Sequence, residues 1–214
     1  MLDALPVKNH IRATCIVGQN FILKNDIPFF EKKDVNIAAF LDAAYDFLEL
    51  KYPKFYKMDN LSKLGILAAE VLLKDASWIK NYPPEEVGIV LSNANASLDT
   101  DIKYYKTVKD FASPALFVYT LPNIMIGEIC IRHHFKGENA FFISREFDAA
   151  FMQHYVDNLI NNNILQSCIC GWIELLNEAC KAVLFLVEKP ANNFSGSLLF
   201  DQETIHKIYH SDNG

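Results

Sequence analysis

The chain has 214 residues, of which 51% are hydrophobic and 21% are charged. This length and apolar content are sufficient for one buried core. The net charge of −6, without a stripe of clustered Lys and Arg, argues against nucleic-acid binding, because phosphate recognition needs such clusters. No apolar run approaches the roughly 20 residues of a membrane-spanning helix, so we expect no membrane association.

The N-terminal residues 1–18 lack the basic region and the uninterrupted apolar region of a secretory signal, so we expect a cytoplasmic protein. The five cysteines are odd in number, and several lie in apolar, strand-like runs, which favours buried reduced thiols over disulfides. Cys168 and Cys170 form a C-x-C pair, but no second Cys/His pair of matching spacing follows. We therefore expect neither a metal nor a cofactor.

The first predicted elements alternate between strand and helix. Residues 11–17 are an apolar run that ends at Gly18, typical of a buried strand. Residues 37–48 repeat apolar side chains on one helical face. A second helix follows Asp59 or Asn60, either of which is a suitable N-cap, and its apolar stripe begins at Leu61.

The second part of the chain continues the alternation. After Pro83-Pro84, the sequence predicts a buried strand, a polar loop and a short amphipathic helix, at residues 87–91, 92–97 and 99–111. Pro122-Asn123 begins another helix, in which Gly127 and Cys130 are small enough for close packing against a neighbour. The remaining predicted elements are a strand at 140–143, a helix at 147–160 and strands at 165–173 and 183–187.

Strands that are apolar throughout and that alternate with helices indicate an α/β fold, with a mixed sheet covered by helices on both faces. We expect one domain over residues 1–190. Residues 191–214, which include the segment ANNFSG and the final HSDNG, are expected to form a loosely structured tail.

Three segments in this order resemble the N-terminal half of β-ketoacyl synthases, which have the thiolase-like fold. They are MDNLSKLGILAAEVLLKD at 58–75, EEVGIVLSNANASLDTD at 85–101 and SPALFVYTLPNIMIGEICIRHHFKGEN at 113–139. Further on, ILQSCICGWIE is similar to the family's strand that ends in a glycine turn and a glutamate, with Gly171 and Glu174 in register, and VLFLVE is similar to its next strand. The resemblance implies a thiolase-like half.

The resemblance fails at the family's nucleophile. A ketosynthase has a cysteine at the strand-to-helix turn after the third segment, whereas this chain has residues 144–148, Ser-Arg-Glu-Phe-Asp, with Glu146 the most plausible replacement. The family's two catalytic histidines come from a second half, which the resemblance does not find here. None of the six histidines takes their place, and we interpret His133-His134 as a pair at a helix end. Independent condensing activity is not expected.

Glu146 has two interpretations. The simpler and favoured one is that Arg145, Glu146 and Asp148 lie at the N-terminus of the following helix, where carboxylates are stabilised by the exposed amides. The other is that Glu146 mimics an acyl thiolate, as Gln or Glu does in ketosynthase relatives that decarboxylate or set chain length. In that case Glu146 and Asn123 would border a pocket for the substrate.

A lone half is expected to leave apolar faces exposed: the helix with Gly127 and Cys130, the stripe that begins at Leu61 and the strand at 164–173. Unless the C-terminal tail folds over them, exposed apolar faces of that size indicate a partner. Because ketosynthases dimerise through strands that flank the nucleophile turn, the resemblance implies pairing with a complete ketosynthase or with a second copy of this chain.

The sequence thus predicts a pseudoenzyme that serves as an accessory or partner subunit in fatty-acid or polyketide biosynthesis, of the kind that makes aryl polyenes, and that docks an acyl carrier protein. Two alternatives stay open. One is a decarboxylase of a malonyl carrier that uses Glu146 with histidines of a partner. The other is a binding module for an acyl chain or coenzyme A, in a pocket near Asn123 and Glu146.

Overall fold

The structure is a computed structural model that describes residues 8–190 and 197–211. Its strands are β1 (His10–Gly18), β2 (Phe21–Lys24), β3 (Ile27–Glu31), β4 (Val87–Asn93), β5 (Asn139–Ile143), β6 (Ser167–Leu176), β7 (Ala179–Glu188) and β8 (Leu198–Leu199). Its α-helices are α1 (Ile37–Phe47), α2 (Asn60–Leu73), α3 (Leu98–Thr107), α4 (Pro114–Phe117), α5 (Asn123–His133), α6 (Ala149–Asn161) and α7 (Gln202–Tyr209). The 3-10 helices η1 (Pro53–Lys57), η2 (Ser77–Asn81) and η3 (Pro84–Glu86) lie in the connections.

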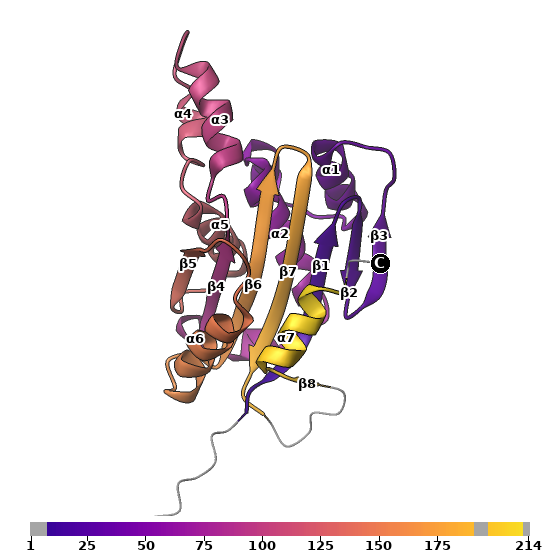
Figure 1. Ribbon diagram of the computed structural model, residues 1–214, viewed down its shortest axis with the longest axis vertical. Coiled ribbons are helices and arrows are strands. Elements are labelled where there is room, and N and C mark those ends of the chain that lie inside the picture. The colour runs from indigo at the N-terminus through magenta and orange to yellow at the C-terminus, as the bar shows by residue number, and fades with distance from the viewer. Residues whose placement is uncertain (1–7, 191–196, 212–214) are drawn as a thin grey trace, which may run out of the picture.

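The strands form one mixed sheet in the order β3-β2-β1-β7-β6-β4-β5, with β8 paired to the start of β1. β4 is parallel to both of its neighbours, β5 and β6, and the other neighbouring strands are antiparallel. The edges of this path are β3 and β5 (Figure 1). The carboxyl ends of β4, β5 and β6 therefore lie at one end of the sheet.

Helices cover both faces of the sheet (Figure 1). The larger hydrophobic core joins α1, α2 and α5 to one face, and the smaller core joins α6 and α7 to the other. The predicted α/β fold with a covered mixed sheet is confirmed, and each predicted strand and helix has a counterpart within a few residues. One boundary differs, because β4 continues through Ser92 and Asn93, which the sequence assigned to the polar loop.

Aspartate and asparagine side chains define where the major helices begin. Asp59 accepts a hydrogen bond from the Ser62 amide at 2.9 Å and is the N-cap of α2, as the sequence predicts. Asn36 serves α1 in the same way. Local capping therefore marks the residues at which these helices begin.

The hairpin of β2 and β3 has no counterpart among the predicted elements. Its signal is nevertheless in the sequence: two short apolar runs are separated by Asn25 and Asp26, both with positive φ, as tight hairpin turns require. Pro28 in β3 fits an edge strand, where the missing amide hydrogen costs no ladder hydrogen bond.

The prediction of a loosely structured tail is wrong for the part of residues 191–214 that the structure describes. Residues 198–209 form β8 and α7, and Phe200 and Ile205 are buried in the smaller core. Asp201 caps α7 by accepting a hydrogen bond from the Thr204 amide. The spacing of Ile205, Ile208 and Tyr209 is the amphipathic signal that predicts this helix. The rest of the expected tail, residues 191–196 and 212–214, lies outside the described residues.

The apolar faces expected to be exposed are largely buried within the chain. Leu61 and the rest of its stripe on α2 pack between the sheet and α5, and the apolar residues of β6 are covered from both sides. The close contact between α2 and α5 is made at Gly65, where a Cβ would lie 2.5 Å from Met125. Gly127 instead faces open space, so the predicted packing role of Gly127 is wrong.

Gly171 allows β6 and β7 to approach each other. Its φ is +142°, and a Cβ would lie 2.0 Å from the carbonyl oxygen of Val183.

We expect Gly171→Ala to destabilise the fold by about 3 kcal/mol or more, because the added carbon meets backbone atoms that cannot move aside. Urea unfolding monitored by circular dichroism measures this change. In the matched control, Gly127→Ala adds a methyl group in open space on α5 and is expected to stabilise the protein by up to about 1 kcal/mol. Equal stability of the two variants would contradict the packing described.

Candidate functional site

The turn at residues 144–148 leads from the end of β5 into α6, as a nucleophile turn does in the resemblance. It is tied to the end of β4, because the Ser144 amide donates to the carbonyl oxygen of Asn93 at 3.0 Å. The Ser144 hydroxyl donates to the backbone carbonyl of Glu146 at 2.8 Å. The turn therefore has a defined geometry at the carboxyl ends of the parallel strands, where α/β proteins usually bind ligands.

Glu146 is exposed and lines a hollow of about 350 Å³. The hollow is formed by residues 144–150 together with Gln202 and His206 of α7. Asn123 does not line it: this residue is exposed at the start of α5, on the face of the sheet opposite to α6. The two residues proposed for one substrate site are therefore not brought together by this hollow.

Asp148, rather than Glu146, caps α6. Its side chain accepts a hydrogen bond from the Phe151 amide at 2.8 Å. The simpler interpretation placed Arg145, Glu146 and Asp148 together at the start of this helix. In the structure Asp148 makes the cap hydrogen bond, and Glu146 lies two residues before it.

Aromatic contacts hold α7 over this turn. Phe147 stacks on Tyr209 with ring centroids 4.6 Å apart and contacts Trp172 of β6 edge-on. The Gln202 amide donates to the Gln153 side chain on α6 at 2.9 Å. Because α7 was not predicted, sequence reasoning also missed that Gln202 and His206 border the turn. The one available signal was the amphipathic spacing of α7.

Glu174 organises the neighbouring loop at residues 94–97. Its carboxylate accepts hydrogen bonds from the amides of Ala94 and Asn95, at 2.7 and 3.3 Å. Asn93 closes the same loop through two hydrogen bonds with the backbone of Ala96, which has positive φ. Glu174, which the resemblance places after the glycine turn, therefore holds the loop at 94–97 at the same end of the sheet.

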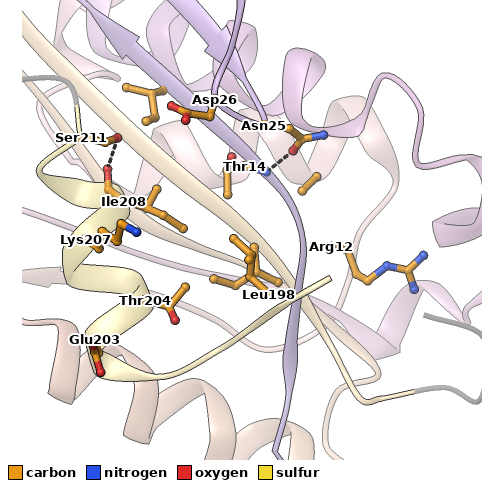
Figure 2. Close-up of a pocket in the computed structure, with 13 residues that line it drawn as sticks. Arg12, Thr14, Asn25, Asp26, Leu198, Glu203, Thr204, Lys207, Ile208 and Ser211 are labelled. Atoms are coloured by element: carbon orange, nitrogen blue, oxygen red, sulfur yellow. Dashed lines mark hydrogen bonds between the residues drawn. The ribbon is translucent and has the colours of Figure 1, made fainter. Parts of the chain in front are cut away.

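A larger cavity, of about 570 Å³, lies on the other side of α7, against β1 (Figure 2). Thr204, Lys207 and Ile208 of α7 face Thr14 of β1 across it, whereas Arg12 points away from α7. Its lining has two basic residues, Arg12 and Lys207, and two acidic residues, Asp26 and Glu203, so the charges of the lining balance. α7 separates this cavity from the turn at 144–148.

The cysteines are not positioned for nucleophilic chemistry. Burial raises the pKa of the Cys15, Cys168 and Cys170 thiols far above the usual range, and raises those of Cys130 and Cys180 to about 11. All five are therefore protonated at neutral pH, as expected for structural thiols. Cys168 and Cys170 are fully buried in β6, and no group of metal-binding side chains occurs in the described part of the chain.

His133 ends α5 and His134 is its C-cap with φ of 61°, which confirms the predicted pair at a helix end. Over residues 8–190 and 197–211, every helix is too short or too polar to cross a bilayer.

No family model matches the sequence, and no curated protein does. Solved structures match it over most of its length. The ishigamide ketosynthase/chain length factor has a TM-score of 0.64 and 18% identity, and the match covers 87% of this chain and 63% of that chain. The chain has the ketosynthase-type, thiolase-like fold.

Two further structures agree. A type II PKS acyl-carrier protein in complex with its ketosynthase, bound to the hexaketide (AntDE:AntF), has a TM-score of 0.59 and 16% identity, over 86% of this chain and 62% of that chain. A ketosynthase (ApeO) in complex with its chain length factor (ApeC) from Xenorhabdus doucetiae has a TM-score of 0.54 and 10% identity. The match covers 88% of this chain and 81% of that chain. The chain spans less than two thirds of the first two structures.

We predict that Glu146 and Asp148 differ in their effect on stability. Asp148→Ala removes the cap of α6 and should cost about 1 kcal/mol of unfolding free energy. Glu146→Ala, which changes an exposed side chain, should stay within about 0.5 kcal/mol of the parent. Chemical denaturation of both variants tests this. A larger loss for Glu146→Ala would mean that Glu146 has a structural role that these contacts do not include.

We also predict that the native protein resists thiol reagents. DTNB at mildly alkaline pH should modify the thiols far more slowly than it modifies free cysteine, because Cys15, Cys168 and Cys170 are buried, Cys130 and Cys180 are partly buried, and the pKa of each thiol is raised. After unfolding in guanidinium, all five should react quickly. A single fast-reacting thiol in the folded protein would contradict the assignment of the cysteines as structural.

Proposed function

We propose that this protein is a non-condensing, ketosynthase-type subunit that acts bound to a complete ketosynthase, in fatty-acid or polyketide biosynthesis of the aryl-polyene kind. The observation that carries the proposal is the strand β5. It is an apolar strand at the edge of the sheet, and it leads directly into the turn that has no cysteine.

The free edge of β5 is suited to pairing with another chain. Among the described strands β5 pairs with β4 alone, and its sequence NAFFI contains no charged residue. Ile143, its last residue, is 53% exposed. Edge strands of soluble proteins are commonly protected by charges, proline or a covering element, because unpaired backbone groups attract other strands. β3, at the opposite edge, has such features in Pro28 and Glu31.

A second apolar surface lies on α3, α4 and the residues that follow them, which we call the arm (residues 98–121). Figure 1 shows α3 and α4 projecting beyond the end of the sheet. Eight large apolar side chains of the arm are at least 40% exposed: Leu98, Ile102, Tyr105, Val108, Phe111, Phe117, Val118 and Leu121. An exposed apolar surface of this kind marks a site of protein association.

The base of the arm is fixed to the body of the protein. The Thr100 hydroxyl of α3 donates to Asp59 at 2.6 Å, and burial raises the pKa of this Asp59 carboxyl above its usual range. The Tyr119 hydroxyl donates to Glu128 of α5 at 3.3 Å, and Glu128 also pairs with Lys54 at 2.7 Å. The arm is therefore held before a partner binds, which lowers the entropic cost of association.

A complete ketosynthase is a better partner than a second copy, because a homodimer would have no reactive thiol to accept an acyl group. In this proposal the partner supplies the cysteine and histidines and receives the acyl carrier protein. The similar structures, which are those of ketosynthases with chain length factors or with a carrier protein, support such an assembly.

The test compares two isoleucines on the two edge strands. Ile143→Lys on β5 should abolish co-purification of a ketosynthase with the tagged chain from its own cells, because a lysine opposes strand pairing. Ile27→Lys on β3 places the same charge at a 67% exposed position of the opposite edge and should leave co-purification unchanged. Mass spectrometry identifies the partner, and light scattering gives the stoichiometry.

Recovery of a ketosynthase in near-equal amount with the parent chain and Ile27→Lys, but not with Ile143→Lys, is the expected result. A parent chain that is a stable monomer in its own cells would refute the subunit proposal. Release of carbon dioxide from a malonyl carrier by the complex, lost in Glu146→Ala, would favour the decarboxylase alternative instead.

A further inference from the structure

A cavity of about 570 Å³ lies at the end of the molecule where α2 and α5 terminate, away from the 144–148 turn. Its floor is apolar and includes Leu50, Ile79 and Phe135. Its charged and titratable residues come from three separate elements: Glu70 and Lys74 from α2, Lys80 from η2, and Arg132, His133 and His134 from the end of α5. In a chain with a net charge of −6, this gathering of basic groups is unusual.

The negative charge of Glu70 is already balanced inside the protein. Its carboxylate accepts a hydrogen bond from Arg132 Nε at 2.6 Å, and the Nε2 atom of His133 lies 3.6 Å from the same oxygen. Arg132 also lies over the ring of Tyr52, 5.1 Å from its centroid. The guanidinium is therefore held in place, and Glu70 does not neutralise the two lysines.

The cavity has a net positive charge. Lys74, Lys80 and Arg132 contribute three positive charges against the single negative charge of Glu70, which leaves two even when neither histidine is counted. Burial is the main cause of a lowered pKa at His133; the Glu70 carboxylate raises this pKa, and Arg132, His134 and Lys80 lower it.

Stabilisation of helix ends explains only part of this cluster. Basic groups near a helix C-terminus interact favourably with its exposed carbonyls, which accounts for Lys74 on α2 and for Arg132 and His133 on α5. Lys80 lies on a five-residue 3-10 helix, too short for a substantial dipole. It is exposed, and the described residues give it no hydrogen-bond or ion-pair partner.

We propose that this cavity binds an organic phosphate monoester, with the dianionic phosphate between Arg132 and Lys80 and an apolar or aromatic group beside Ile79 and Phe135. Lys74 also lines the cavity, but its Nζ lies over the ring of Phe29, 4.9 Å from the centroid, so it contributes through its charge. Two net positive charges match the charge of a phosphate monoester, and arginine is well suited to phosphate oxygens. The volume lies within the range of small-molecule sites. The site does not depend on the proposed ketosynthase partner.

The test uses adenosine 5′-monophosphate as the probe, with inorganic phosphate and adenosine as separate arms. In proton NMR of the full chain, the monophosphate should bind saturably and raise the pKa of His133, because a nearby anion favours the protonated ring. The ring signals of His154, which is exposed on α6 outside the cavity, should not change when the monophosphate is added. Inorganic phosphate should bind about tenfold more weakly, since it lacks the apolar contact, and adenosine should not shift the His133 pKa.

A matched pair of variants places the site. Lys80→Glu should weaken binding of the monophosphate about tenfold or more without unfolding the protein, because the side chain is exposed. Lys57→Glu changes an exposed lysine outside the cavity and should bind as the parent does. Equal binding of phosphate and the monophosphate, an unchanged His133 pKa, or equal effects of the two variants would overturn the proposal and leave nonspecific ion binding.

Discussion

The fold depends on covering both faces of the three central strands β4, β6 and β7. Every residue of β4 is buried, and β7 is completely buried from Ala182 to Val187. A strand that is apolar on both sides is stable only between two layers, because either face would otherwise be left in contact with water. α2 and α5 supply one layer, and α6 together with α7 supplies the other. The short C-terminal helix is thus a structural part of the domain.

The same arrangement determines the surroundings of the 144–148 turn. Because α7 completes the second layer, its Tyr209 packs on Phe147 and its residues Gln202 and His206 border the hollow at Glu146. The turn connects β5 to α6 and has carboxylates at Glu146 and Asp148 but no thiol. The cysteines that the chain does have serve as small apolar residues in the strands and in α5.

α2 connects the two regions to which we assign functions. It has 14 residues, which corresponds to a length of about 21 Å. At its N-terminus, Asp59 both caps the helix and holds the arm through Thr100. At its C-terminus, Lys74 and Glu70 contribute to the proposed phosphate cavity. Protein association and ligand binding are therefore proposed at opposite ends of one rigid, buried helix, where they do not compete for the same surface.

The sequence by itself determined the elements whose signals are local. The Asp59 cap, the stripe that begins at Leu61 and the apolar runs of β4, β6 and β7 predict helices and strands correctly, because capping and periodicity act over a few residues. The three matching segments also indicated the thiolase-like fold. They could not show how the remaining residues would pack, and the expected exposed faces of α2 and β6 were wrong for that reason.

Only the tertiary structure decided which surfaces remain open. α7 covers a face that the sequence left bare, β5 becomes an edge because no described strand pairs beyond it, and the arm keeps its apolar residues in solvent. The separation of Asn123 from the hollow at Glu146, and the position of Lys80 and Arg132 along one cavity, follow from contacts between residues far apart in the chain. Such juxtapositions depend on the packing of whole layers, which no local pattern of residues encodes.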